Sequence, residues 1–211
     1  MTDETRRINQ ARFTRSASEY AASRVTARRE QIEALMALAS PAAHDRVLDV
    51  ACGPGALLAT LAPRVRRTVG LDLTPAMLQL ARAAAPKAWC VRGAAERLPF
   101  DDCALDAVLS TSAFHFFDQH AALDEFYRVL APGGFAAIAT LSPDRHSVPA
   151  LRRVLDDRVP ANTPTPDEMR TMFERAAFEV ALQRPVHRTL TVPFAMVDWI
   201  TVGLKHNADV G

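Results

Sequence analysis

The chain has 211 residues, of which 49% are hydrophobic and 23% are charged, and its formal net charge is +1. A chain of this length and apolar content predicts one well-filled α/β domain and is too short for two full domains. The near-zero net charge gives no broad basic surface for a nucleic-acid backbone, so we expect a small-molecule ligand and no nucleic acid.

Cysteine spacing and the termini narrow the class of protein further. The cysteines Cys52, Cys90 and Cys103 have no C-x-x-C spacing and no accompanying histidines, which predicts buried apolar side chains and neither a metal site nor a disulfide frame. The charged N-terminus lacks the apolar core of a signal peptide. The apolar stretch from Val192 to Leu204 is shorter than the roughly 20 residues that a membrane span requires. We therefore predict a cytoplasmic protein without membrane insertion.

The N-terminal region is predicted to be helical. Apolar residues recur at helical spacing between Glu19 and Leu38 among arginines and glutamates. Such a pattern predicts a helix that packs one face on a sheet. Phe13 and Tyr20 belong to a shorter segment before this helix, and aromatic side chains of this kind anchor a segment at a packing seam.

A buried-strand pattern then ends in a glycine-rich turn. The run Val47-Leu48-Asp49-Val50-Ala51-Cys52-Gly53-Pro54-Gly55 leads into a helical pattern over Ala56 to Ala62. Glycine lets the backbone approach a ligand closely, and a helix N-terminus favours a carboxylate or phosphate. The dinucleotide pattern G-x-G-x-x-G needs a third glycine where this chain has Leu58. The turn therefore predicts a cofactor site but does not name the cofactor.

An acidic residue ends the second predicted strand. Asp72 lies roughly 20 residues after the glycine turn, at the distance where nucleoside-binding α/β units place the carboxylate that takes the ribose hydroxyls. Thr74 and Pro75 then provide an N-cap and a first-turn proline for the next helix. The unit is predicted to be strand, glycine turn, helix, strand, acid, helix.

Further strands complete the predicted sheet. A third strand precedes Gly93, a fourth covers Leu105 to Leu109, and a fifth covers Phe135 to Ala139. A helix over Asp124 to Leu130 and the turn Pro132-Gly133-Gly134 lead into the fifth strand. Short strands that alternate with helices predict a doubly wound, mostly parallel α/β sheet, whose ligands bind at the carboxyl ends of the strands.

The last third of the chain is less regular. Residues 141–165 are predicted to be a loop and an arginine-rich helix, and Thr165 caps a further helix. A sixth strand begins at Phe178, and a final helix covers Ala195 to His206. Either Arg188 to Val192 is a seventh strand or that strand is absent, and an absent strand leaves an open sheet edge that favours a homodimer.

Several motifs, taken in order, resemble those of a known family. They are the glycine turn, Gly93-Ala94-Ala95-Glu96-Arg97-Leu98-Pro99-Phe100-Asp101, the strand Leu105 to Leu109, and Leu130-Ala131-Pro132-Gly133-Gly134. Together they resemble the class I S-adenosylmethionine-dependent methyltransferases, and among these the small-molecule "type 11" group of ubiquinone and menaquinone C-methyltransferase-like proteins. The resemblance covers Val47 to Thr140 and is looser in the N-terminal helices.

The resemblance implies a Rossmann-like methyltransferase sheet with N-terminal helices and a small helical substrate cap. Residues 1–40 are expected to form the N-terminal helices and a lid, and residues 41–211 the domain that binds S-adenosylmethionine. Residues 141–165 are then a variable insertion on the substrate side. In this interpretation Phe13 and Tyr20 lie over the cofactor.

The resemblance also implies a set of cofactor-binding residues. Asp49 and the glycine turn border the methionine half, Asp72 holds the ribose hydroxyls, and Leu73 and Met77 flank the adenine. Asp49 can instead orient the turn, and Met77 falls on a helix face where core packing is usual. The full set is Asp49, Ala51, Gly53, Gly55, Asp72, Leu73, Met77, Ala94, Ala95, Glu96, Ser110 and Tyr20.

Two features of the expected site depart from the family pattern or stay open. Ala94 stands where the family often has an aspartate that binds the adenine amine, so weaker cofactor affinity is expected. His115 lies in a segment that resembles the one between cofactor and acceptor. A histidine that titrates near neutrality can take the acceptor's proton, whereas the alternative is a structural histidine that caps local backbone.

These features favour methyl transfer to a small organic acceptor. Aromatic residues are expected to line an apolar pocket for an aromatic or lipidic acceptor. They are Phe114, Phe116, Phe117, Phe194 and Trp199. Arg145 and His146 either meet an anionic acceptor or face solvent. A non-catalytic nucleoside-binding protein or partner subunit is the alternative function, and a nicotinamide-dependent oxidoreductase is a third, which Leu58 opposes.

Overall fold

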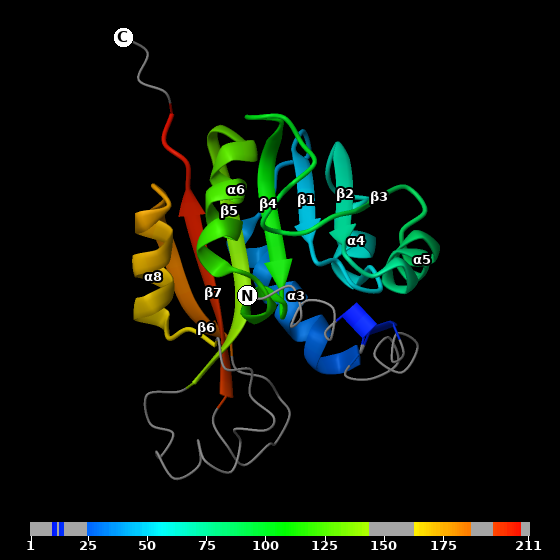
Figure 1. Ribbon diagram of the computed structural model, residues 1–211, viewed down its shortest axis with the longest axis horizontal. Coiled ribbons are helices and arrows are strands. Elements are labelled where there is room, and N and C mark those ends of the chain that lie inside the picture. The colour runs from blue at the N-terminus through cyan, green and yellow to red at the C-terminus, as the bar shows by residue number, and fades with distance from the viewer. Residues whose placement is uncertain (1–9, 12, 15–24, 144–162, 187–195, 208–211) are drawn as a thin grey trace.

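The computed structural model describes residues 10–11, 13–14, 25–143, 163–186 and 196–207 (Figure 1). The elements in chain order are α3 (Val25–Ala39), β1 (Arg46–Val50), α4 (Ala56–Leu61), β2 (Arg67–Asp72), α5 (Pro75–Ala84), β3 (Trp89–Arg92), β4 (Leu105–Thr111), the 3-10 helix η1 (Phe114–Phe116), α6 (Gln119–Val129), β5 (Leu130–Pro143), α8 (Pro166–Arg175), β6 (Glu179–Val186) and β7 (Met196–Leu204). The predicted helices and strands from Arg46 to Ala139 are confirmed in type and order.

All seven strands belong to one sheet, in the order β3-β2-β1-β4-β5-β7-β6. β1 to β5 pair in parallel, and β7 pairs antiparallel with both β5 and β6. The connection from β3 to β4 crosses β2 and β1, so the direction of winding changes between β1 and β4. Such a switch point is where open α/β sheets bind ligands. The predicted doubly wound fold is confirmed.

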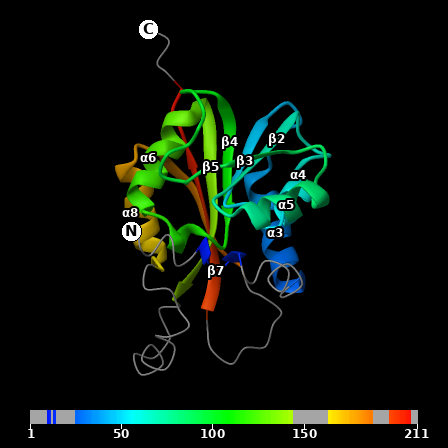
Figure 2. The ribbon, with the colours of Figure 1, turned by 45° about the vertical axis from the view of Figure 1, so that its right-hand side comes forward.

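Helices cover both faces of the sheet (Figures 1 and 2). On one face α6 and α8 pack on the sheet around Phe126 and Phe173, which are fully buried. On the other face α3 and α4 pack on the central strands, and α4 also packs on α5 through Leu58 and Ala81. Successive strand residues point to opposite faces, so β1 contributes Leu48 to the first layer and Val47 to the second. Leu58 is therefore a core residue.

The end of the chain corrects the prediction most clearly. Residues 196–204 form β7, a strand, where the sequence predicted a final helix. The segment is rich in β-branched and aromatic residues, and it lies between β5 and β6, where Ile200 and Thr201 are fully buried. The seventh strand is therefore present at Met196–Leu204, and the interpretation that it is absent is wrong. The other candidate for this strand, Arg188 to Val192, lies outside the described residues. The argument for a homodimer that depended on the absent strand falls with it.

The first residues of β5 and α8 can be compared with the predicted ones. β5 begins at Leu130, five residues before the predicted start. The predicted turn at Pro132 and Gly133 is part of the strand, where the register of pairing with β4 shifts. α8 begins as predicted. The Thr165 hydroxyl accepts a hydrogen bond from the backbone N–H of Glu168, whose side chain bonds back to the backbone of Thr165, so the two form a capping box.

The cysteines only partly match the prediction. Cys52 is buried, Cys90 is half-buried, and Cys103 is exposed in a turn with φ of 57°. Cys103 is not the buried residue that the sequence predicted, because the turn between Phe100 and Leu105 lies at the surface. In the described part of the chain no helix is long and apolar enough to cross a membrane.

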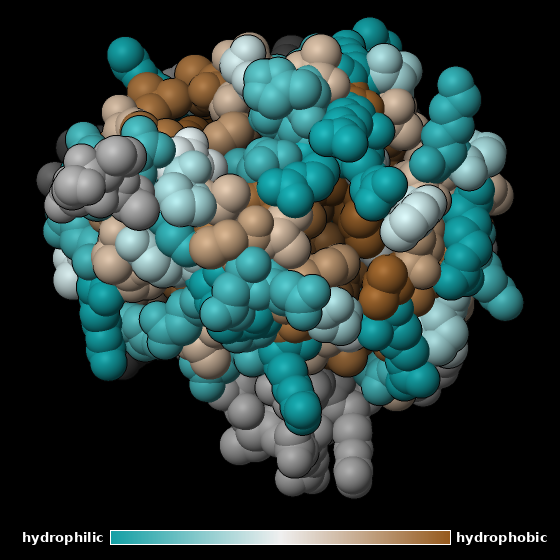
Figure 3. All heavy atoms as spheres, turned by 90° about the horizontal axis from the view of Figure 1, so that it is seen from above, coloured by the Kyte–Doolittle hydropathy of each residue, from teal (hydrophilic) through white to brown (hydrophobic). Residues whose placement is uncertain are grey.

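The two ends of the parallel strands differ in character. Figure 3 looks onto the end where β1, β2 and β4 begin, which is largely hydrophilic around a more apolar hollow. The strands run away from this viewpoint, so their carboxyl ends lie on the far side. The pocket described next lies there.

Candidate functional site

A pocket opens at the carboxyl ends of β1, β2 and β4, at the switch point of the sheet. The space free of protein atoms in and at the mouth of the pocket is about 790 Å³, which includes open solvent. Its walls come from the strand ends, the loops that follow β2, β3 and β4, and the segment around Phe13. The residues that line it are Gln10, Phe13, Val50, Ala51, Gly53, Leu71, Asp72, Leu73, Thr74, Met77, Gly93, Ala95, Glu96, Thr111, Ser112, Ala113, Phe116 and Phe117.

The glycine turn after β1 forms the floor of the pocket on one side. Ala51, Gly53 and Gly55 all have positive φ, at 58°, 52° and 90°. A Cβ added at Gly53 would meet nothing within 4 Å, whereas one added at Gly55 would lie 2.8 Å from the Cα of Ala81. Gly53 therefore keeps the pocket open, and Gly55 lets α4 approach α5. Gly55 does not line the pocket, and close helix packing accounts for a glycine at this position, so its predicted cofactor contact stays a prediction.

Asp72 ends β2 and lines the pocket. Its Oδ2 accepts a hydrogen bond from the backbone N–H of Gly53 over 3.0 Å, and its Oδ1 accepts one from Thr74 over 2.8 Å. Burial raises the pKa of Asp72, and these two N–H donors act against that rise because they favour the ionised form. The structure thus fixes a carboxylate at the pocket wall, where the sequence predicted one.

Asp49 is the second acid at this end of the sheet. Its side chain is buried, and neither carboxylate oxygen has a hydrogen-bond partner. Desolvation raises the pKa of Asp49 well above the ordinary range, and the nearby charge of Asp72 raises it further. The interpretation that Asp49 orients the turn through backbone amides is wrong, since no such bond forms. Asp49 lies two residues before Ala51 but is not part of the pocket lining.

The loops after β2 and β3 form the wall beside Asp72. Leu73, Met77, Ala95 and Glu96, which the sequence predicted to bind the cofactor, line the pocket, and Met77 is also buried against the core. Ala94 does not line it; its carbonyl instead accepts a hydrogen bond from Arg97.

The end of β4 forms the opposite wall. Thr111, Ser112 and Ala113 line the pocket, together with Phe116 and Phe117 from η1 and the residue after it. Ser112 has a φ of 53°, a conformation that non-glycine residues rarely adopt. Ser110 precedes Thr111 on β4 and does not line the pocket. Its buried hydroxyl donates to the carbonyl of Val50 over 3.0 Å.

His115 lies behind this wall. Its ring packs on Phe116, with ring centroids 4.0 Å apart, and it is not among the lining residues. Its Nδ1 is buried without a hydrogen-bond partner, so this atom does not cap local backbone, and the interpretation of His115 as a structural residue stays a prediction. Desolvation lowers the pKa of His115 to about 4, because burial penalises the charged imidazolium. The proton-accepting role of His115 stays a prediction.

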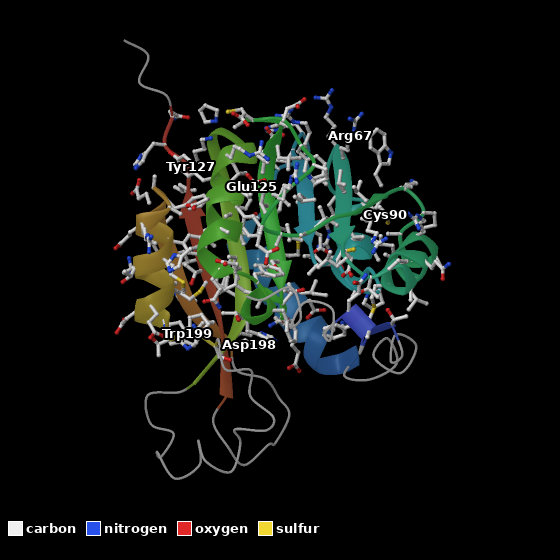
Figure 4. All side chains as sticks on the ribbon, in the orientation of Figure 1. Arg67, Cys90, Glu125, Tyr127, Asp198 and Trp199 are labelled. Carbon is white, nitrogen blue, oxygen red and sulfur yellow. The ribbon has the colours of Figure 1, made fainter. Side chains whose placement is uncertain are left out.

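Aromatic residues from three places were predicted to line an acceptor pocket. Phe116 and Phe117 line the pocket described above, and Phe13 meets Phe116 edge-on, with ring centroids 5.3 Å apart. Their contact with an acceptor stays a prediction. Phe114 is instead fully buried in the core. Trp199 lies on β7 toward α8, away from β1 and β2 (Figure 4). Tyr20, Arg145, His146 and Phe194 lie outside the described residues.

Sequence reasoning missed several polar residues at the site. Gln10 lines the pocket and donates from Nε2 to the carbonyl of Leu73 over 3.0 Å. Its position three residues before Phe13 on a helical segment was a usable signal, because residues three apart share a helix face. Gln31 is fully buried on α3 and accepts a hydrogen bond from the Ser112 hydroxyl over 2.8 Å. No local pattern reveals that contact, which joins residues far apart in the chain.

Comparisons with known proteins agree with this geometry. A family model described as "Methyltransferase domain" matches residues 48–138. An uncharacterized methyltransferase of Mycobacterium tuberculosis is 45% identical over 94 residues, which cover 44% of this chain and 39% of that protein. A malonyl-[acyl-carrier protein] O-methyltransferase of Enterobacter lignolyticus is 34% identical over 190 residues, which cover 88% of this chain and 72% of that protein.

A solved structure shows the same fold over nearly the whole chain. A chain from Haloferax volcanii, solved in complex with a methyltransferase activator, superposes with a TM-score of 0.80 at 22% identity. The match covers 96% of this chain and 99% of that one. At this identity the likeness concerns the fold alone.

Proposed function

The chain belongs to the S-adenosylmethionine-dependent methyltransferase family, and from this premise we propose that it transfers the methyl group of S-adenosylmethionine to a small organic acceptor. The observation that carries the proposal is the placement of Asp72 and Gly53 on one pocket at the switch point of the sheet. The matched stretch spans only 39% of the mycobacterial relative's length. Both the activity and the acceptor of this chain are therefore part of the proposal.

Residues that line the pocket or lie beside it fit the cofactor. Asp49 is a buried carboxylate without a partner, and a nearby cation would favour its ionised form. S-Adenosylmethionine carries its methyl group on a positively charged sulfur, so its charge suits a pocket beside two acids. Open space next to Gly53 lets a ligand lie against the backbone, as the cofactor requires.

Each wall of the pocket is proposed to contact a different part of the cofactor. Asp72 would bind the ribose hydroxyls, and Leu73 and Met77 would flank the adenine. The remaining part of the cofactor then extends toward the end of β4, where Thr111 and Ser112 lie. Ala51 and Gly53 would border it from the glycine turn. The methyl group would therefore face the wall that Phe116 and Phe117 form.

The proposed chemistry depends mainly on alignment. A lone pair of the acceptor forms the bond to the methyl carbon while the carbon–sulfur bond breaks and its electron pair stays on sulfur. Holding the reacting atoms in line supplies much of the acceleration in such displacements, so few catalytic groups are needed. The protein's part is to orient both reactants and exclude water. A proton released by the acceptor would go to solvent or to a base.

Phe13, Phe116 and Phe117 favour an apolar acceptor. All three line the pocket, and the rings of Phe13 and Phe116 are in edge-on contact. Small-molecule sites of this kind bind aromatic or aliphatic groups through buried apolar area. We propose an aromatic or lipidic acceptor on this ground. A relative that acts on a malonyl group held by acyl-carrier protein makes an acyl chain one acceptor to include in a test.

Turnover separates the enzyme from a protein that only binds the cofactor. The purified chain is incubated with S-adenosylmethionine and a panel of phenols, quinols and acyl thioesters, and S-adenosylhomocysteine is measured by mass spectrometry. Acceptor-dependent S-adenosylhomocysteine that disappears in Asp72→Ala supports the proposal. Cofactor binding without turnover on any member of the panel would favour the non-catalytic alternative.

A further inference from the structure

Trp89 lies exposed on a strand at the edge of the sheet. It is 60% exposed, whereas Trp199, the other tryptophan of the chain, is half-buried on β7. β3 is the first strand in the sheet order and, within the described residues, pairs with β2 alone. One side of its backbone is therefore a free edge, where N–H and C=O groups are available to another strand.

The surface around Trp89 is strongly basic. Between Asp49 and Glu96 the sequence contains one acid, Asp72, which is buried at the wall of the cofactor pocket. The same stretch has six basic residues, all of them exposed: Arg64, Arg66, Arg67, Arg82, Lys87 and Arg92. None of the six forms an ion pair with a described acid. This end of the sheet therefore carries positive charge that no neighbour neutralises.

The two faces of β3 differ. Trp89 and Arg92 are three residues apart and so point to opposite faces of the strand. On the first face the Arg67 guanidinium lies over the Trp89 ring, 4.6 Å from its centre. On the second face Cys90 packs against α5, and Arg82 of that helix donates from Nη2 to the carbonyl of Cys90 over 3.3 Å. Figure 4 places Arg67 and Cys90 at the end of the sheet opposite α8.

Protection of the edge explains only part of this surface. Lysine and arginine beside a short edge strand prevent it from pairing with other chains, which accounts for Lys87 and Arg92. It does not account for the tryptophan between them, because a large exposed apolar ring favours such pairing. Tryptophan and arginine are instead the residues that most often carry the binding energy of protein interfaces.

The charge of the edge selects the kind of partner. A second copy of this chain would bring the same cations to the contact, so like charges oppose a homodimer here. A nucleic-acid backbone would attract the arginines, but it cannot pair with an open strand, and a net charge of +1 supplies no broad basic surface. An extended acidic peptide segment meets both requirements, because its backbone continues the sheet and its side chains alternate between the two faces.

We propose that the β3 edge is a docking surface for an acidic protein segment, which adds to the sheet as a strand beside β3. Its apolar side chains lie on the face of Trp89, and its carboxylates lie on the face of Arg82 and Arg92. This inference goes beyond the proposed methyl transfer and does not depend on it.

A defined peptide tests the inference. The probe is a peptide of alternating glutamate and valine, which in a strand presents valines on one face and glutamates on the other. Binding of its fluorescein-labelled form is followed by anisotropy at low ionic strength. The unlabelled form is added to a Trp199→Phe variant, in which Trp89 is the single tryptophan. We expect saturable binding and a shift of Trp89 emission to shorter wavelength.

Two variants remove the two halves of the surface. Trp89→Thr, which keeps a strand-forming residue at an exposed position, should weaken the peptide at least about 10-fold. Arg82→Glu should weaken it about fivefold, since an attraction becomes a repulsion. Arg170→Glu is the matched control, because it makes the same change of charge on α8, at the opposite end of the sheet. It should change the affinity less than about twofold.

Three further ligands decide the kind of partner. The same peptide with N-methylated backbone amides cannot donate to β3 and should bind at least about 10-fold more weakly, and a lysine–valine peptide should not bind. Equal binding of the N-methylated peptide would show a charged patch alone and overturn strand addition. Tighter binding of a single-stranded oligouridylate that is lost in Trp89→Thr would assign the edge to nucleic acid instead. Failure of the wild type to bind the glutamate–valine peptide would overturn the inference outright.

Discussion

The carboxylate of Asp72 accepts a hydrogen bond from the backbone N–H of Gly53 over 3.0 Å and so connects the end of β2 to the glycine turn after β1. Asp72 is the last residue of β2, Gly53 lies in the turn after the neighbouring parallel strand β1, and both line the same pocket. The bond holds the turn open while leaving the carboxylate at the pocket wall. Each carboxylate oxygen keeps a further lone pair, which can accept a hydrogen bond from a ligand hydroxyl.

Asp72→Ala should remove cofactor binding. Each hydrogen bond to a charged group contributes about 1.5–3 kcal/mol, so losing two to a ribose weakens S-adenosylhomocysteine by at least about 100-fold. Calorimetric titration measures the change. Asp106→Asn is the control, because Asp106 pairs with Arg46 at the start of β4, far from the pocket. That control should lose stability and keep its affinity; an equal loss of affinity in both variants would contradict the assignment.

The two turn glycines should respond differently to alanine. Gly53→Ala meets open space, so it costs only the strain of a positive φ, about 1 kcal/mol, and its methyl group narrows the pocket and weakens S-adenosylhomocysteine. Gly55→Ala adds a collision with the backbone of Ala81 and should cost about 3 kcal/mol in total. Urea unfolding measures both free energies. Equal destabilisation by the two variants would show that α4 and α5 are not in close contact at Gly55.

Asp49 should couple cofactor binding to proton release. Its pKa is raised by burial, so the folded state holds the proton more tightly than the unfolded state does. Stability from this group is thus present at low pH and falls as pH rises from about 4 toward the raised pKa. A bound sulfonium favours the ionised carboxylate, so S-adenosylmethionine should bind more tightly as pH rises through that range.

Calorimetry in buffers of different ionisation enthalpy counts the protons released. Uncharged sulfur in S-adenosylhomocysteine makes it the control ligand, for which the release should be smaller. Asp49→Asn should abolish the difference between the two ligands. A difference that survives in this variant would assign the proton to another group.

His115 should stay neutral wherever the protein is folded and active. Because its pKa is lowered to about 4, the unfolded chain binds the extra proton more readily, and stability from this group is lost as pH falls from about 6.5 to 4. His115→Phe should therefore flatten the fall in unfolding free energy over that range. The rate of methyl transfer, measured against pH, should show no titration of His115 near neutrality. A titration near pH 6.5 that is present in the wild type and absent in His115→Phe would instead support His115 as a base.

Lys205 should support the fold without affecting the site. Its Nζ donates to the carbonyls of Tyr127 and Leu130 at the end of α6 over 2.8 and 2.7 Å, and it lies 4.5 Å from the Tyr127 ring centre. Lys205→Met should cost about 2 kcal/mol, because two helix-end carbonyls lose a cationic donor. Lys87→Met is the exposed control, with an expected change below about 0.5 kcal/mol. S-Adenosylhomocysteine affinity should be unchanged in both.

The alternating units up to β5 were predictable because each depends on local signals. The glycine turn, the acid at the end of β2 and the Thr74–Pro75 start of α5 all lie within a few residues of the structure that they determine. β7 was not predictable in this way. Its segment between Met196 and Leu204 is apolar enough for a buried helix or strand, and pairing with β5 and β6 decides between them.

The site was predictable to the extent that a short motif determines it. Asp72, Gly53 and the residues beside them were found from spacing, whereas the contact between Gln31 and Ser112 arises only when α3 packs beneath the end of β4. His115 shows the opposite case. Its residue type suggested proton transfer, but burial behind Phe116 determines its pKa, and burial is a tertiary property.

The central claim is that this pocket binds S-adenosylmethionine, and calorimetric titration of the purified chain tests it most directly. S-Adenosylmethionine and S-adenosylhomocysteine are titrated in turn, with NADH as the control ligand. Saturable one-site binding of both sulfur compounds, with no heat from NADH, is the predicted result. Absence of binding by both, or binding of NADH in their place, would contradict the account.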